Sequence, residues 1–197
     1  ILKLSDGKPV VSPTQDMVMG SYYLTIDREG AKGEGRYFSS PDEAIMAYEN
    51  GEIELQSVVN IRVEKMAEGE KISGIIRTTV GRIIFNEAIP QDLGFTERKT
   101  KEDYLKNEIE FLVGKKQLSQ IVERCFKLKG TTKTAEVLDA IKSLGYKYST
   151  IGAITASVFD MAIPQEKPEI LHKAEAKVIE IEDLYNMGLI TDNERYK

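Results

Sequence analysis

Few side chains in this sequence have the types and spacing that catalysis or ligand binding requires. Gln15 and Asp16 stand together in the stretch SPTQDMVMG, ahead of a mainly apolar run. They are either helix-capping residues or polar groups presented to a channel or a substrate. Arg82, in TVGRII, is either anchored to a buried carboxylate or offers its planar guanidinium to a phosphate. The residue types alone leave both pairs of alternatives open.

The usual catalytic and metal-binding motifs do not occur in the sequence. It has no nucleophile elbow, P-loop, HExxH motif or clustered aspartates. The single Cys125 cannot form an internal disulfide, and with the single His172 it cannot complete a zinc site. His172 lies in a charged helical pattern, which favours a solvated position over a general base. Neither free-standing catalysis nor a structural metal is therefore expected within these residues.

The composition is that of an ordinary soluble globular protein, with 41% hydrophobic and 30% charged residues in 197 positions. This length supports one core or two small subdomains. No apolar run approaches the roughly 20 residues that a membrane span needs, and no signal pattern is present, so a cytoplasmic protein without membrane contact is expected. The net charge of -5 argues against a surface that binds nucleic acid by itself.

Local patterns predict the elements that would position these side chains. Residues 2–13 are typical of a short hairpin. Thr14, as N-cap, and Asp16, in the first turn, predict a short helix, in which Gly20 indicates the close approach of another backbone. The glycine-rich residues 31–38 predict a turn rather than a phosphate-binding loop, because no strand precedes them and no long helix follows.

The middle of the chain predicts further helices and a pair of strands. A capping box of Ser40 and Glu43 begins a helix that Gly51 ends. Alternating apolar residues predict a strand over 53–63, with 70–78 as its antiparallel partner. The remaining predicted helices open at Thr78 or Thr79 and stop before Pro90, run from Lys115 to Lys129 with Gly130 as the stop, and run from a Thr134 cap through Leu144 to a stop at Gly145.

The last part of the sequence has the pattern of a coiled coil. Apolar residues recur at intervals of three and four among many Glu and Lys: Leu171, Ala174, Val178, Ile181 and Tyr185. Gly188 ends this arm, and Thr191 with Glu194 caps a return arm of which only three more residues are present. Residues 165–197 hold eight acidic and five basic residues, which favours a basic partner over nucleic acid.

These patterns together predict an α+β fold. A small mixed β-sheet with short helices is followed by a projecting antiparallel coiled-coil hairpin, truncated at its return helix. Two functional hypotheses follow from this fold. The chain is either a self-contained protein-interaction adaptor with a coiled-coil arm or a piece of a longer polypeptide. The incomplete return arm favours the second, since a helix of less than two turns does not nucleate alone.

Five stretches, taken in order, resemble the beta-prime subunit family of bacterial DNA-directed RNA polymerase. They are ILKLSDGKPVVSPTQDMVMGSYYLT, AKGEGRYFSSPDEA, TTVGRIIFNEAIP, FDMAIP and EAKVIEIEDLYNMGLITDNERYK. Each is weak alone, but five in register across the chain are specific. The resemblance implies that residues 1–163 form the pore region around the secondary channel, and that residues 164–197 begin the funnel with the first rim helix and its tip.

The resemblance also implies a function and its partners. The full enzyme would transcribe DNA into RNA from four ribonucleoside triphosphates, with alpha, beta, omega and sigma subunits and with Mg²⁺ and Zn²⁺ bound outside these residues. The channel would admit nucleotides and receive backtracked RNA, with Gln15, Asp16 and Arg82 on its wall. The isolated chain would be inactive. Transcript-cleavage and other channel-binding factors would dock on the helical tip, at Glu182, Asp183, Asn186, Leu189 and Ile190.

Overall fold

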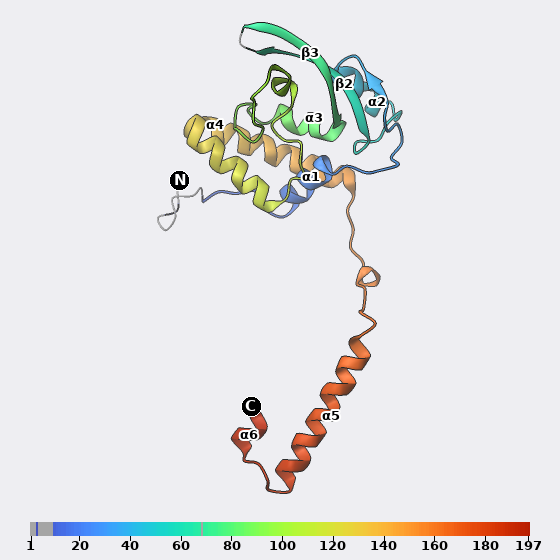
Figure 1. The fold of residues 1–197 in the computed structure, drawn as a ribbon, viewed down its shortest axis with the longest axis vertical. Coiled ribbons are helices and arrows are strands. Elements are labelled where there is room, and N and C mark those ends of the chain that lie inside the picture. The colour runs from blue at the N-terminus through green and yellow to red at the C-terminus, as the bar shows by residue number, and fades with distance from the viewer. Residues whose placement is uncertain (1–2, 4–9, 68) are drawn as a thin grey trace. The chain divides into compact units, whose positions relative to one another are not determined.

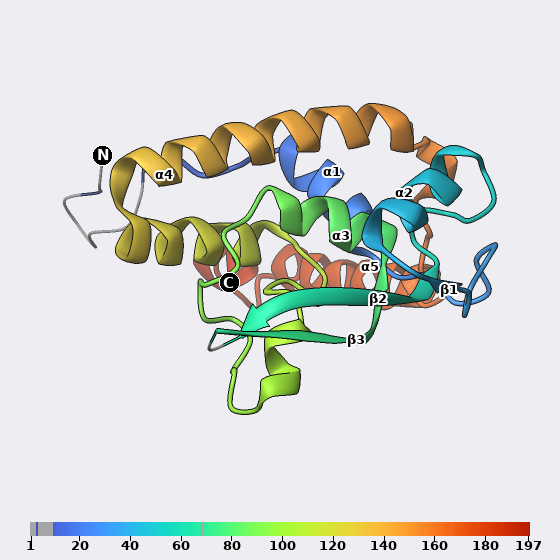
Figure 2. The same ribbon diagram turned by 90° about the horizontal axis from the view of Figure 1, so that it is seen from above.

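A computed structural model describes residues 3, 10–67 and 69–197, which divide into two compact units, Ile1–Ile154 and Thr155–Lys197 (Figures 1 and 2). In chain order the first unit holds α1 (Asp16–Thr25), β1 (Tyr37–Phe38), α2 (Pro41–Glu49), β2 (Val58–Ala67), β3 (Glu70–Thr79), α3 (Val80–Glu87), the 3-10 helix η1 (Lys101–Leu105) and α4 (Lys115–Gly152). The second holds η2 (Val158–Asp160), α5 (Lys167–Asn186) and α6 (Asp192–Tyr196). The predicted α+β class is confirmed.

The sheet of the first unit is small and mixed, in the order β1-β2-β3. β1 pairs parallel with β2, and β2 pairs antiparallel with β3 over ten residues, from Val58 opposite Thr79 to Ala67 opposite Glu70. The antiparallel partner predicted at 70–78 is thus confirmed. The hairpin predicted for residues 2–13 falls largely outside the described residues.

The strand predicted to begin at Ile53 begins only at Val58. Ile53 and Leu55 are both 2% exposed, so the alternating apolar residues are indeed buried. They lie in a turn, however, and not in a strand. The Ser57 amide donates to the Glu54 carbonyl at 3.2 Å, and the Ser57 hydroxyl donates to the Lys32 carbonyl at 2.6 Å. A buried turn and a half-buried strand place apolar residues with the same period of two, so the sequence pattern could not separate them.

α4 consists of two helical arms divided at Gly130, in agreement with the two helices that the sequence predicts, and the arms form a helical hairpin. Gly130 interrupts it with a φ of 76°, so the predicted stop there is confirmed, and Figure 2 shows the two arms side by side. The second arm does not open with a Thr134 cap, because the Thr134 hydroxyl donates back to the Gly130 carbonyl at 2.8 Å. It also continues through Gly145 to Gly152, which corrects the predicted end.

Glycine allows α1 to lie directly on α4. A Cβ atom on Gly20 would stand 1.9 Å from the Gly145 carbonyl oxygen, and one on Gly145 would stand 2.6 Å from the Met17 Cα. Neither contact is possible for a real side chain, so both positions require glycine. The close backbone approach predicted at Gly20 is confirmed, and it explains why Gly145 lies inside a helix.

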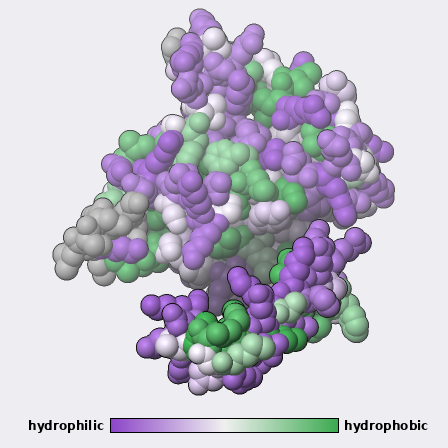
Figure 3. Space-filling view, turned by 60° about the horizontal axis from the view of Figure 1, so that its bottom comes forward, coloured by the Kyte–Doolittle hydropathy of each residue, from purple (hydrophilic) through white to green (hydrophobic). Residues whose placement is uncertain are grey.

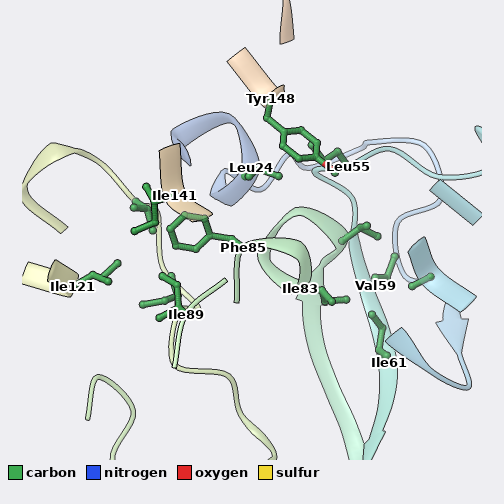
Figure 4. Close-up of a cluster of buried hydrophobic side chains, with 14 of the residues drawn as sticks. Leu24, Leu55, Val59, Ile61, Ile83, Phe85, Ile89, Ile121, Ile141 and Tyr148 are labelled. Atoms are coloured by element: carbon green, nitrogen blue, oxygen red, sulfur yellow. The ribbon is translucent and has the colours of Figure 1, made fainter. Parts of the chain in front are cut away.

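The core lies where α3 packs between the sheet and the α1–α4 layer. Phe85 of α3 is fully buried among residues from α4 and from the segment after α3, including Ile141, Ile121 and Ile89 (Figure 4). Thr79 caps α3, as predicted, by accepting from the Arg82 amide at 3.2 Å. Ser40 likewise caps α2, although the Glu43 carboxylate accepts from Ser39 rather than from Ser40.

Candidate functional site

Gln15 lies in a tight turn that opens α1. The Met17 amide donates to the Thr14 carbonyl at 3.1 Å, and Gln15 between them has φ 47° and ψ -119°. These angles match the first central position of a type II′ turn, which glycine normally occupies. The Gln15 side chain is exposed and makes no capping hydrogen bond. The predicted Thr14 cap is therefore wrong, because the Thr14 carbonyl rather than its hydroxyl is used.

Asp16 is the first residue of α1, where its negative charge interacts favourably with the positive end of the helix dipole. Its side chain is exposed. Gln15 and Asp16 thus present an amide and a carboxylate side by side on the surface of the first unit. The Gln15 side chain therefore does not cap the helix, and its presentation to a channel or a substrate stays a prediction.

Arg82 is held at the other end of α1. Its Nε donates to the carbonyl of Thr25 at 3.0 Å, and its guanidinium lies 3.5 Å from the Asp27 carboxylate. The Arg82 side chain is only 12% exposed, whereas that of Asp27 is 56% exposed. Arg82 is therefore anchored, as one hypothesis held, but by a backbone carbonyl and a half-exposed carboxylate rather than by a buried one.

The three predicted channel residues do not converge on one point. Gln15 and Asp16 lie at the start of α1 and Arg82 contacts its last residue, Thr25. A helix of ten residues is about 15 Å long. A small molecule therefore cannot touch all three at once, whereas an extended wall could include them.

Arg82 also borders a hollow that the sequence did not predict. The hollow, of about 660 Å³, is lined by Arg82, by Arg77 of β3, by Lys106 and by Glu110, together with strand and η1 residues. Burial raises the pKa of the Glu110 carboxyl, although the Thr78 hydroxyl donates to it at 3.0 Å. Neither Glu110 nor Lys106 belongs to a recognisable motif, and only the folding of η1 against the sheet brings them to Arg82.

The helical tip of the second unit is a separate, exposed surface. α5 ends at Asn186, Gly188 turns the chain with a φ of 72°, and α6 begins after Thr191. Glu182, Asp183 and Asn186 are exposed, and Leu189 is 68% exposed. In the described part of the chain, neither Glu182 nor Asp183 forms an ion pair, so both carboxylates are available to a partner.

The start of the return arm has the predicted capping box. The Thr191 hydroxyl accepts from the Glu194 amide at 3.4 Å, and the Glu194 carboxylate accepts from the Thr191 amide at 2.8 Å. The Thr191 amide and the Thr191 hydroxyl each donate to the Glu194 carboxylate at 2.8 Å, and these two hydrogen bonds hold the pKa of Glu194 below its usual value. The Arg195 guanidinium lies 4.6 Å from the centre of the Tyr185 ring, which ties α6 back to α5. Tip residue Ile190, between them, is half-buried.

The described residues contain no group of three or more His, Cys, Asp and Glu side chains that could hold a metal ion. Within the same residues, no helix is long and apolar enough to cross a membrane.

The chain is similar to one part of known RNA polymerase subunits. The chain is 57% identical over 196 residues to the DNA-directed RNA polymerase subunit beta' of Acetivibrio thermocellus. It is 55% identical over 197 residues to the subunits of that name from Clostridium acetobutylicum and Caldicellulosiruptor saccharolyticus. Each match covers 100% of this chain but only 17% of the relative.

A family model described as RNA polymerase Rpb1, domain 3, matches residues 1–161. The matched residues include all of the first unit, with α1, the sheet, α3 and the α4 hairpin. The resemblance found in the five sequence stretches is thereby confirmed. The chain belongs to the RNA polymerase Rpb1, domain 3 family.

Proposed function

We propose that this chain works as part of the beta-prime type subunit of a DNA-directed RNA polymerase, the nucleotidyltransferase that makes RNA on a DNA template from ribonucleoside triphosphates. The observation that carries this proposal is the identity of 53–57% to beta' subunits over the whole chain. The active assembly would be cytoplasmic and would include alpha, beta, omega and sigma subunits. The adaptor hypothesis has no comparable support.

The first unit forms part of the wall of the secondary channel in this proposal. Its exposed amide at Gln15 and carboxylate at Asp16 border the path of nucleotides and of backtracked RNA. Arg82 is mostly buried, so it contributes chiefly by fixing the end of α1 against α3. The wall has no catalytic group of its own, and Mg²⁺ and Zn²⁺ are bound by other parts of the subunit. The isolated chain is accordingly expected to incorporate no nucleotides.

The second unit offers a docking hairpin to channel-binding factors such as transcript-cleavage factors. Its tip combines free carboxylates at Glu182 and Asp183 with the exposed apolar side chain of Leu189 and the amide of Asn186. Charged groups around an apolar anchor are typical of protein interfaces. The acidic charges would attract a basic surface of the factor and orient it on the tip.

Charge reversal at the tip tests this proposal. A polymerase that carries this sequence, with its return helix complete, would be titrated with a transcript-cleavage factor. Glu182→Lys with Asp183→Lys should weaken binding at least about ten-fold, or about 1.4 kcal/mol, because a basic partner would then meet like charge.

The matched control is Glu175→Lys, a reversal at another exposed position of α5, seven residues before Glu182. This control should leave the affinity within about two-fold, a change well under 1 kcal/mol. Equal affinities for the wild type and the double variant would rule out docking at the tip.

A further inference from the structure

We infer that the stretch leading into α5 is a second interaction surface, distinct from the tip, and that its occupant is an apolar surface of the same subunit outside residues 1–197. This inference rests on the proposed function, since it takes the chain to work within a larger subunit. The surface consists of Val158, Phe159, Met161, Ile163 and Ile170, here called the apolar base.

The apolar base is almost fully exposed. Val158 is 80% exposed, Phe159 96%, Met161 74%, Ile163 71% and Ile170 63%. Four of these apolar side chains fall within residues 158–163, VFDMAI, which hold no Gly, Ser or Pro and only one charged residue, whereas a linker is normally rich in these types. Exposed apolar groups gathered in this way mark interaction sites.

Local hydrogen bonds hold part of this stretch in a fixed shape. Ser157 and Asp160 form a capping box around η2: the Ser157 hydroxyl accepts from the Phe159 amide at 3.3 Å, and the Asp160 carboxylate accepts from the Ser157 amide at 2.7 Å. These hydrogen bonds define the backbone turn that carries Val158 and Phe159, while both side chains remain largely exposed. A preorganised segment loses less conformational entropy on binding than a flexible one.

A hollow of about 430 Å³ lies beside the apolar base. It is lined by Pro164, by Ile170 and Leu171 of α5, and by Glu166 and Lys167. The stretch thus offers both a projecting ring, that of Phe159, and a recess at the start of α5. Figure 3 shows apolar residues in green on the surface of the C-terminal part of the chain.

The charge of the stretch points to the chemistry of its occupant. Asp160 is the only charged residue between Ala153 and Pro164, and its carboxylate already serves the capping box. The charge-poor part of the base in and around η2 therefore fits an apolar surface, and the charges of Glu166 and Lys167 lie only at its border with α5. Interfaces of this composition are typical of permanent rather than transient association.

The relatives indicate where such a surface would come from. This chain matches only 17% of the length of the beta' subunits, so most of a related subunit lies outside the match. An apolar surface in the same polypeptide is present at a high effective concentration, unlike that of a separate protein. Contact between the apolar base and this surface would fix the start of α5, while the tip of the hairpin stays free for docking factors.

Hydroxyl-radical footprinting with mass spectrometry tests the inference, because it reports the exposure of the Phe159 and Met161 side chains directly. Their oxidation would be compared in the 197-residue chain and in an assembled polymerase whose beta-prime subunit carries this sequence. The inference predicts at least ten-fold less oxidation of both residues in the polymerase. Phe159→Ser should restore oxidation of Met161 there, whereas the control Glu175→Ser, on an exposed residue outside the base, should not.

Each other outcome overturns the inference. Equal oxidation in the two samples means that nothing covers the base. Protection already present in the dilute chain assigns the occupant to residues 1–154, and protection that depends on chain concentration assigns it to a second copy. Transcription and factor binding by the same polymerase are measured separately. An active polymerase with an exposed Phe159 contradicts only the apolar base, and an inactive one with a protected Phe159 contradicts only the proposed function.

Discussion

Gln15 has a backbone conformation that favours glycine, although it carries a long polar side chain. Its φ of 47° and ψ of -119° suit glycine, yet the position carries a long amide side chain that makes no capping contact. Strain of this kind often occurs at functional sites, where a side chain is needed despite the conformation. The channel-wall role proposed for Gln15 would explain why the turn does not contain glycine.

Substitution at Gln15 separates its structural role from its functional role. Gln15→Gly should raise the free energy of unfolding by about 1 kcal/mol, because it removes the steric cost of the left-handed conformation. Gln15→Ala should bring no such gain. Both changes should slow elongation or transcript cleavage in the polymerase if the amide lines the channel. Denaturant unfolding and single-round transcription measure the two effects.

The control for this experiment is Gln120→Gly, at an exposed helical position of α4. Glycine there should lower the free energy of unfolding by about 1 kcal/mol. A stabilised Gln15→Gly polymerase with unchanged elongation and cleavage would return Gln15 to a purely structural role.

The sequence could predict the presence of Gln15 at the start of α1 but not its conformation. Glutamine carries no turn signal, whereas a glycine at the same position would have indicated a positive φ. The partner of Arg82 could not be predicted either, because a guanidinium donates equally well to a phosphate and to a carbonyl. Only the fold brings the Thr25 carbonyl within reach of Arg82. The tip residues were easier to place, since the Thr191–Glu194 capping box is a local signal.

Among the elements, the crossing of α1 and α4 depends on two glycines. Gly20→Ala should lower the free energy of unfolding by about 2 kcal/mol or more, because the new Cβ would meet the Gly145 carbonyl and overpacking outweighs the gain in helix propensity. Gly114→Ala is the matched control, since its Cβ would meet only the movable Gln117 side chain at 3.3 Å.

This control should change stability by less than about 0.5 kcal/mol. Denaturant melts of the wild type and both variants provide the measurement. A Gly20→Ala chain as stable as the wild type would mean that α1 does not lie on α4 in this way.

Secondary structure was predictable where a local signal decided it. The caps at Ser40, Thr79 and Thr191 and the break at Gly130 were all visible in the sequence. Gly145 was not, because the same residue type ends a helix or permits a close crossing, and only tertiary packing distinguishes the two. The start of β2 was missed for a related reason, since buried turn residues imitate a strand.

At the scale of the whole molecule, the chain is one part of a larger assembly in this account. In the proposal, its first unit forms part of the channel wall, and its second unit offers a hairpin with an acidic tip and an apolar base. Neither the charge, nor the hydrophobic periodicity, nor any catalytic motif of the 197 residues indicates transcription. The order of five stretches across the sequence did so, and the family match supports it.

Templated RNA synthesis by a reconstituted polymerase tests this account most directly. The beta-prime subunit of Acetivibrio thermocellus would carry this sequence in place of its own matching residues, to which it is 57% identical. The account predicts an assembled enzyme with elongation and cleavage rates within about two-fold of the parent, a difference of well under 1 kcal/mol in activation free energy. A correctly assembled enzyme that makes no RNA would contradict it.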